Sequence, residues 1–267
     1  MRLTATGRMH EILRSLTPDA RVLDLGCQYG SFPAGATRAL VVRLDRDAPI
    51  QQAAGFVQAD AASLPFADGA FQAVIANHSL EHFDRLDDVL REIGLVVRRD
   101  GALFVAVPDA STLTDRIYRW VGRGGGHVNP FTDAAALARR IEKATGLPHV
   151  ATQPLWSSLS FLNRRRAPRP LPKRLWLLGG GYEWTLFGYV WLSRRIDRWF
   201  GTRLGHYGWA FTFGCAAAPR DPDGWPNVCI RCGSGCAAGE LRTRLLFPGL
   251  SAWRCPHCGA RNPYCRE

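Results

Sequence analysis

Two cysteine pairs near the end of the chain have the spacing of metal ligands. Cys229 and Cys232 lie in the segment CIRCG, and Cys255 and Cys258 lie in CPHCG. Each pair holds two thiolates with two residues between them and a glycine after the second, as a tight knuckle around a tetrahedral ion requires. The pattern predicts a closed, structural zinc site in a small zinc-ribbon-like domain over residues 226–267.

The distribution of cysteines favours metal ligation over disulfide bonding. Seven of the eight cysteines lie in the last 53 residues, and the first residues contain no apolar run with a cleavage site of the secretory kind. We therefore expect a cytoplasmic chain, in which thiols stay reduced. Cys236 and Cys265 fit a knuckle less well than the paired cysteines, and Cys27 and Cys215 are expected to be buried core thiols.

A second group of residues predicts a nucleoside-binding site. The segment RVLDLGCQYGSF, residues 21–32, has the pattern of a buried strand that ends in a glycine turn. Asp24 lies near the end of this strand, and Gly26 and Gly30 would let a ligand approach the backbone closely. About 20 residues further on, at the end of the next strand pattern, Asp45 is placed to accept hydrogen bonds from ribose hydroxyls.

The acid beside the glycine turn distinguishes two nucleoside cofactors. A carboxylate at Asp24 would repel the pyrophosphate of a dinucleotide, but it could bind an ammonium group. Gln28 stands where the dinucleotide motif G-x-G-x-x-G has its second glycine. Both features favour S-adenosylmethionine over NAD as the ligand.

Strand and helix patterns alternate from residue 21 to about residue 109. A helix is predicted from Leu86 to a stop at Gly101, and another over residues 131–146 with Thr132 as its cap and Gly146 as its stop. This alternation predicts an α/β fold with a doubly wound parallel sheet and right-handed crossovers. The predicted strands cover residues 21–26, 39–45, 55–60, 71–77 and 101–109, with a later one in the segment YGWAFTFGCAA.

Taken together, these motifs resemble the class I S-adenosylmethionine-dependent methyltransferases, in particular the group that includes quinone and other small-molecule methyltransferases. The resemblance covers residues 7–150 and implies a Rossmann-like sheet, mostly parallel with an antiparallel last strand. It also implies that Asp45 binds the ribose, that Asp60 meets the adenine amino group, and that Asn77 lies near the methionine part. The cofactor-binding residues that it implies are Asp24, Gly26, Gly30, Asp45, Asp60, Ala61 and Asn77.

The predicted domains are a methyltransferase domain over residues 1–218, with an insertion at about 163–205, and the ribbon. Between residues 163 and 204 there are ten Arg or Lys against two acids, so this segment carries +8 of the net charge of +11. Its cations and aromatic residues suit the headgroup region of an anionic membrane, and three glycines with Glu183 argue against a spanning helix. The alternatives are an extra core layer and stacking on nucleic-acid bases. The aromatic residues are Trp176, Tyr182, Trp184, Phe187, Tyr189, Trp191, Trp199 and Phe200.

Methyl transfer from a sulfonium is a direct displacement, so alignment of the reactants and exclusion of water matter most and a general base is optional. If the acceptor is a hydroxyl or an acidic carbon, the candidate bases are His78, His82, Asp109 and His127. The alternative for Glu81 and His82 is a structural role, in which they only orient the segment after the fourth strand.

Three hypotheses about function follow. The first is a methyltransferase for a small-molecule or lipid acceptor, with peripheral contact to the inner surface of a membrane. The second is an RNA-directed methyltransferase that grips nucleic acid with the insertion and the ribbon, although NHSLEH replaces the proline-aromatic motif typical of base N-methylation. The third is a cofactor-binding interaction module without catalysis. The sequence leaves open which atom is methylated, and it gives no indication of oligomeric state.

Overall fold

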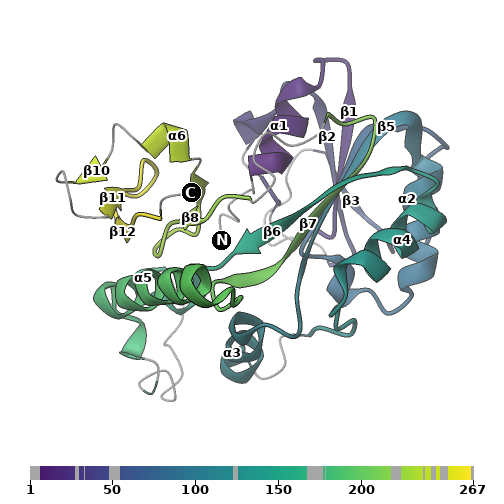
Figure 1. The fold of residues 1–267 in the computed structure, drawn as a ribbon. Helices are drawn as coiled ribbons and strands as arrows, with labels where there is room; N and C mark the ends of the chain where they lie inside the picture. The colour runs from purple at the N-terminus through teal and green to yellow at the C-terminus, as the bar shows by residue number, and fades with distance from the viewer. Residues whose placement is uncertain are drawn as a thin grey trace. The chain divides into compact units, whose positions relative to one another are not determined.

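The chain forms a central sheet covered by helices, together with a small cysteine-containing segment (Figure 1). The computed structural model describes residues 7–27, 30–32, 34–47, 55–122, 126–166, 177, 179–217, 224–236, 238–241, 245–246 and 252–265.

The central sheet has seven strands in the order β3-β2-β1-β4-β5-β7-β6. They are β1 (Arg21–Leu25), β2 (Leu40–Asp45), β3 (Phe56–Gln58), β4 (Phe71–Asn77), β5 (Val97–Pro108), β6 (His149–Trp156) and β7 (His206–Gly214). Strands β3, β2, β1, β4 and β5 pair in parallel with their neighbours. The chain runs outward from β1 to β3 and then returns to the other side of β1 as β4. Ligands of such sheets bind at this reversal, at the carboxyl ends of β1 and β4.

Strand β7 is antiparallel to its neighbours in the sheet, β5 and β6. The amide of Cys215, just after β7, donates to the carbonyl of Gly101 in β5, and the amide of Gly214 donates to the carbonyl of Pro148, just before β6. The end of β7 therefore lies beside the early parts of β5 and β6. This confirms the predicted Rossmann-like sheet, which is mostly parallel with an antiparallel strand.

By packing, the chain divides into two compact units. The first comprises Met1–Asp109, Gly126–Gln153 and Trp209–Pro222, and the second Ala110–Gly125, Pro154–Gly208 and Asp223–Glu267. The predicted domain boundaries, 1–218 and 226–267, concern units that would fold separately, and they stay a prediction.

The first unit contains α1 (Gly7–Ser15), η1 (Ala34–Ala36), η2 (Leu80–His82), α2 (Leu86–Val96) and α4 (Ala134–Thr145). Its core is apolar on both sides of the sheet, with Leu23, Val74 and Leu103 fully buried. Strands covered on both faces have nearly continuous apolar runs, as β1, β4 and β5 do.

Two helix ends differ from the sequence prediction. Helix α2 ends at Val96 and the chain continues directly as β5, so the predicted stop at Gly101 was wrong; the β-branched pair Val96 and Val97 fits either element. Helix α4 is capped by Asp133, whose side chain accepts from the amide of Ala136, and not by Thr132. Its predicted stop is confirmed, because Gly146 has a left-handed backbone at φ 71°.

Close packing of α2 on α4 requires a glycine at position 94. A Cβ atom there would lie 2.7 Å from the Cα and 2.9 Å from the carbonyl oxygen of Thr145 at the end of α4. Both neighbours are backbone atoms, so the two helices would have to move apart to accept any side chain.

The second unit contains α3 (Leu113–Gly122), η3 (Ser160–Leu162) and α5 (Glu183–Phe200). The cysteine segment adds β8 (Asn227–Val228), β9 (Gly235–Cys236), α6 (Ala238–Leu241), β10 (Leu245–Leu246), β11 (Ala252–Arg254) and β12 (Arg261–Pro263). β8 and β9 form one antiparallel pair, and β10, β11 and β12 form a second small sheet.

Helix α5 in the insertion was not predicted. It follows three glycines with left-handed backbones, Gly179, Gly180 and Gly181, and it ends at Gly201, which also has a positive φ. In the sequence these glycines interrupt the apolar run, but in the structure they precede the helix.

Part of the basic charge of the insertion is internal. The side chain of Arg194 is buried; its Nη1 atom donates to the carbonyl of Gly205 at 2.8 Å and its Nη2 atom to that of Ser157 at 2.7 Å. The carboxylate of Asp197 accepts from the amides of Leu204 and Gly205, each at 2.7 Å. These groups fix the loop after α5, so Arg194 does not contribute to a basic surface.

We predict opposite effects for alanine at two helical glycines. Gly94→Ala should lower the free energy of unfolding by about 1–3 kcal/mol, because it overpacks the contact between α2 and α4. Gly188→Ala in α5 meets no atom within 4 Å, so it should raise stability by about 0.5–1 kcal/mol through helix propensity. Chemical denaturation of both variants checks this, and equal effects would contradict the packing argument.

Candidate active site and candidate metal centre

The glycine turn after β1 depends on Gly26 for two reasons. Its backbone is left-handed at φ 65°, a conformation that few residues other than glycine adopt. A Cβ atom at this position would also lie 2.6 Å from the Cβ atom of Ser79 and 3.1 Å from the ring of Phe83. The amide of Gly26 donates to the carbonyl of Leu44 at 2.8 Å. The turn is thus pinned to the end of β2 and packed against the segment that follows β4.

Asp24 places a fully buried carboxylate beside this turn. Its Oδ2 atom accepts from the amide of Ser31 at 2.9 Å and lies 3.9 Å from Nε of Arg43, while Oδ1 has no hydrogen-bond partner among the described residues. Burial raises the pKa of Asp24, and the hydrogen bonds from Ser31 and the charge of Arg43 oppose this effect. A cationic ligand group would supply the interaction that Oδ1 lacks.

Two further predicted acids lie at the same edge of the sheet. Asp45 is the last residue of β2, and Asp60 follows β3, which pairs in parallel with β2. Asp60 accepts from the amide of Ala62 at 2.9 Å and from Nη2 of Arg85 at 2.7 Å. The Ala62 hydrogen bond and the Arg85 guanidinium lower the pKa of Asp60, so this carboxylate is charged. Ala61 beside it is buried.

The end of β4 carries Asn77 and a strained histidine. Asn77 is the last strand residue and is buried. His78 has a left-handed backbone at φ 55°, and its amide donates to the carbonyl of Ala106 in β5. Non-glycine residues in this conformation cost free energy and often mark functional sites.

Arg43 and Ser79 are site residues that the sequence interpretation missed. Arg43 pairs in register with Asp24 across β1 and β2, and a Cβ atom at Gly30 would lie 3.0 Å from its Nε atom. The hydroxyl of Ser79 is buried without a hydrogen-bond partner among the described residues. Arg43 precedes Asp45 by two residues, so strand alternation could have placed both side chains on one face. Gln28, which departs from the dinucleotide motif, lies outside the described residues.

Three of the four candidate bases gather near Glu81. His78 Nδ1 lies 3.6 Å from Oε1 of Glu81, and the rings of His82 and His127 are 5.0 Å apart in an edge-to-face arrangement. One ligand atom each of Glu81, His82 and His127 lies within 4.8 Å of the others. Asp109 is buried just after β5 and is not part of this group.

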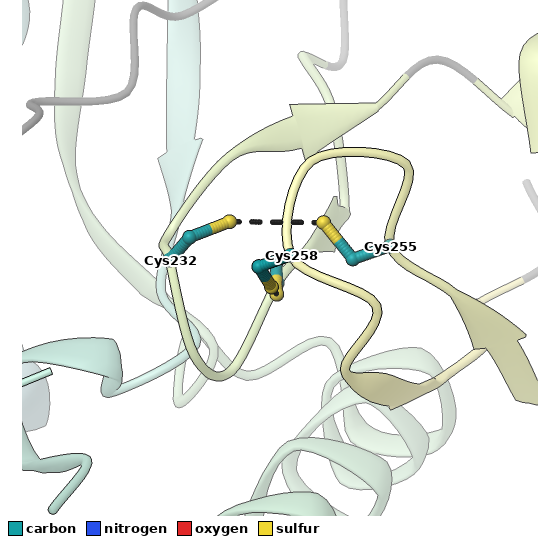
Figure 2. A group of neighbouring side chains, drawn as sticks. Cys232, Cys255 and Cys258 are labelled. Carbon is teal, nitrogen blue, oxygen red and sulfur yellow. Dashed lines mark hydrogen bonds between the residues drawn. The ribbon is translucent and has the colours of Figure 1, made fainter. Parts of the chain in front are cut away.

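The four paired cysteines converge on one point. Their Sγ atoms all lie within 4.8 Å of one another, with 3.5 Å between Cys229 and Cys258 and 3.7 Å between Cys232 and Cys255. Figure 2 shows the thiols of Cys232 and Cys255 facing each other, with Cys258 beside them. Zn–S bonds of about 2.3 Å in a tetrahedron place sulfurs about 3.8 Å apart, so the arrangement fits zinc.

The two knuckles have the same backbone hydrogen bonds. The amides of Gly233 and Gly259 each donate at 2.9 Å to the carbonyl of the first cysteine of their pair, Cys229 and Cys255. Both glycines have left-handed backbones, at φ 74° and 72°. The glycine after each C-x-x-C pair is therefore required by the turn that brings the two thiols together.

The remaining cysteines divide into buried and exposed thiols. Cys236 and Cys265 are buried and lie outside the four-sulfur cluster. Cys27 is buried as expected, and burial raises the pKa of its thiol to about 12. Cys215 is exposed, so its predicted place in the core was wrong: it lies just past the last residue of β7, where the alternation of the strand no longer holds.

The order of the central sheet is that of a Rossmann-like fold, which the chain shares with solved methyltransferases. Residues 23–105 match the family described as methyltransferase domain. In solved structures, the chain is similar to a SAM-dependent methyltransferase from Archaeoglobus fulgidus, with a TM-score of 0.53, 18% identity and coverage of 77% of this chain and 89% of the other. A putative methyltransferase from an antibiotic biosynthesis pathway of Anabaena variabilis has a TM-score of 0.52, 13% identity and coverage of 79% and 98%.

Two sequence relatives carry the same name. The malonyl-[acyl-carrier protein] O-methyltransferase of Legionella pneumophila is 31% identical over 128 residues, which are 42% of this chain and 45% of the relative. That of Halorhodospira halophila is 28% identical over 174 residues, which are 60% and 57% of the two chains. The chain thus spans about half the length of the curated relatives it matches.

Proposed function

We propose that this protein is an S-adenosylmethionine-dependent methyltransferase that acts on a small-molecule or lipid-like acceptor. The observation that carries the proposal is the buried Asp24 carboxylate beside the Gly26 turn, within a segment that matches the methyltransferase domain family. The cofactor carries an ammonium group, and a buried carboxylate with an unpaired oxygen is a suitable partner for it.

Each of the side chains at the sheet edge would bind a different part of the cofactor. Asp24 would hold the ammonium group, Asp45 the ribose hydroxyls, Asp60 with Ala61 the adenine, and Asn77 would lie near the methionine part. When bound, the cofactor supplies an electrophilic methyl group on a sulfonium. The residues of the chain hold the reactants in line and exclude water, which accounts for most of the catalysis that such a displacement needs.

The relatives support an oxygen acceptor. Their names specify O-methylation of malonyl-[acyl-carrier protein], so we propose that a carboxyl or hydroxyl oxygen is methylated here. Neither name concerns a nucleic acid, so the RNA-directed alternative gains no support. The match to a methyltransferase domain and the names of the relatives argue against a module without catalysis.

Loss of the Asp45 carboxylate should weaken cofactor binding. Charged hydrogen bonds to hydroxyls contribute about 1.5–3 kcal/mol each, so Asp45→Ala should raise the Kd for S-adenosylhomocysteine at least tenfold in calorimetry. The matched control is Asp47→Ala, which removes an exposed carboxylate two residues away and should leave the Kd unchanged. A wild type that binds NADH and not S-adenosylhomocysteine would contradict the proposal.

We also propose that Cys229, Cys232, Cys255 and Cys258 hold a structural zinc ion that organises the second unit. One of the two residues between the first pair, Ile230, is buried in a core with Leu186 and Val190 of α5. The amide side chain of Asn163 donates to the carbonyl of Ile230 at 2.9 Å. Four thiolates make a closed site, so the ion would stabilise this packing and take no part in methyl transfer.

An ion pair joins the same knuckle to the start of α5. The Nη2 atom of Arg231 donates to Oε2 of Glu183 at 2.9 Å, and its Nη1 atom donates to the carbonyl of Cys258 at 2.9 Å. The guanidinium of Arg231 lowers the pKa of Glu183, so this carboxylate stays charged. A change at the metal centre should therefore affect α5.

Removal of two thiolates should release the metal and loosen the second unit. Cys255→Ser with Cys258→Ser should reduce bound zinc from one per chain to none by elemental analysis, and it should lower the Tm. The control is Cys215→Ser, which changes an exposed cysteine outside the cluster and should change neither quantity. Zinc retained at full occupancy by the double variant would place the metal elsewhere.

We further propose that α5 contacts an anionic membrane surface from one side. Trp184, Trp199 and Phe200 are exposed by 73%, 65% and 74%, and Arg195 stacks on the ring of Trp191 at 4.2 Å. Phe187 and Tyr189 instead pack on the core of the second unit, so the predicted extra core layer accounts for part of the aromatic set. Within the described ranges, no helix is long and apolar enough to cross a membrane.

Binding to lipid vesicles should require the exposed tryptophans of α5. Basic residues near an anionic surface contribute about 1 kcal/mol each, so the full chain should sediment with anionic vesicles at low salt and be released at high salt. Trp184→Ala with Trp199→Ala should reduce the bound fraction severalfold, whereas Trp120→Ala, an exposed tryptophan of α3, should not. Tight RNA binding without vesicle binding would favour the nucleic-acid alternative.

A further inference from the structure

The short helix η2 after β4 carries a carboxylate and an imidazole. A second imidazole, from a loop that is distant in the sequence, lies close to both. Glu81 and His82 come from η2, and His127 lies in the segment that precedes α4. One ligand atom from each residue lies within 4.8 Å of the other two. These three residues all belong to the first unit.

One oxygen of the Glu81 carboxylate lacks a hydrogen-bond partner among the described residues. Glu81 is 1% exposed, and its Oε2 atom is buried without a hydrogen-bond partner among the described residues. The Oε1 atom of Glu81 lies 3.6 Å from Nδ1 of His78, which is beyond a good hydrogen bond. A buried carboxylate oxygen without a partner is costly, and a cation at this position would satisfy it.

Anchoring of the loop does not require the imidazoles. The amides of Val128 and Asn129 donate to the carbonyl of Glu81 at 2.8 and 3.0 Å. The side chain of Asn129 also donates to the carbonyls of Leu80 and Phe83 at 3.0 and 2.8 Å. Four hydrogen bonds thus hold this loop against η2 and bring His127 beside Glu81 and His82.

The orientation of His82 is that of a metal ligand. Its Nδ1 atom lies 2.9 Å from the carbonyl oxygen of Gly126, which can only accept, so Nδ1 is the donor and, in the neutral ring, Nε2 has the lone pair that binds a metal. Metal-binding histidines commonly donate their other ring N–H to a carbonyl or carboxylate in this way, which fixes the tautomer and the ring.

We propose that Glu81, His82 and His127 bind one divalent transition-metal ion. Two imidazoles and a carboxylate form a donor set used for manganese, iron, cobalt and zinc, and three protein ligands leave positions open. Bonds of about 2.0–2.2 Å place neighbouring ligand atoms of one ion about 3.0–3.8 Å apart; the three ligand atoms lie within 4.8 Å of one another, so side-chain movements of about 1 Å suffice to close the site.

The ion would lie near the Gly26 turn, beside the proposed cofactor site, and the role given to it here rests on the proposed function. Ser79 and Phe83, which flank the two η2 ligands, are the residues against which a Cβ at Gly26 would collide. An acceptor oxygen held by the ion would lose its proton to solvent more readily. Its lone pair would then form the O–CH₃ bond as the C–S bond breaks and the bonding electrons pass to sulfur.

Manganese(II) alone is a suitable probe because it prefers nitrogen and oxygen ligands to thiolates. We expect calorimetry and electron paramagnetic resonance of the full chain to show one bound Mn²⁺. His82→Gln and His127→Gln should each raise its Kd at least tenfold. The matched control His149→Gln, an exposed histidine bonded to Thr152, should leave the Kd unchanged, as should the Cys255→Ser and Cys258→Ser variant.

The outcomes separate the metal site from the proposed function. Binding of S-adenosylhomocysteine, measured in parallel, reports folding and the cofactor site of each variant. A wild type that binds S-adenosylhomocysteine but no Mn²⁺ would overturn the metal site, as would unchanged Mn²⁺ affinity in His127→Gln. Mn²⁺ binding without any S-adenosylhomocysteine binding would overturn the methyltransferase proposal and leave the metal site standing. Glu81→Gln should also lose Mn²⁺ binding. If this variant does not fold, the Mn²⁺ affinity of His82→Gln, which changes an exposed side chain, provides the test.

Discussion

Complete burial of the Asp24 carboxylate is the constraint around which the first unit is arranged. A charge without contact with water needs compensation, and the neighbouring elements supply it in part. The Ser31 amide approaches because the chain turns back after β1, and Arg43 approaches because β2 pairs in register with β1. The turn itself is possible because Gly26 has no side chain, which lets Ser79 and Phe83 close over it. Among the described residues, one oxygen of this carboxylate has no hydrogen-bond partner, and under the proposed function the ammonium group of the cofactor would supply it.

The second unit depends on contacts between its cysteine segment and α5. Its cysteine segment has short strands and a small core, so it gains little stability from its own burial. The knuckle at Cys229 inserts Ile230 into the core formed with α5, while Arg231 pairs with Glu183 at the start of that helix. A metal ion at the four thiols would therefore hold the knuckle in the conformation that supports the helix. In this arrangement, the insertion and the cysteine segment depend on each other.

Local patterns were sufficient to predict the glycine turn, both knuckles and six of the seven strands of the central sheet, but not β6. Gly26, Gly233 and Gly259 need left-handed backbones within a few residues of the groups that they position, so short motifs carry that information. The remaining features depend on contacts between distant residues. Arg43 is part of the site because of strand register, and His127 reaches His82 through the loop held by Asn129. Helix α5 was missed because its preceding glycines resemble interruptions of an apolar run.

The two candidate metal centres differ in the number and kind of their ligands, as structural and catalytic metal sites do. The cysteine centre offers four soft ligands from two symmetrical knuckles, and nothing in that set leaves room for a further ligand. The group at Glu81 offers three harder ligands from one side, next to a residue, His78, whose backbone is strained. Strain and unpaired buried charge are costs that folding alone would remove. Among the described residues, Asp24 and Glu81 each keep a buried carboxylate oxygen without a hydrogen-bond partner, and under the two proposals the cofactor and the metal ion would supply the missing interactions.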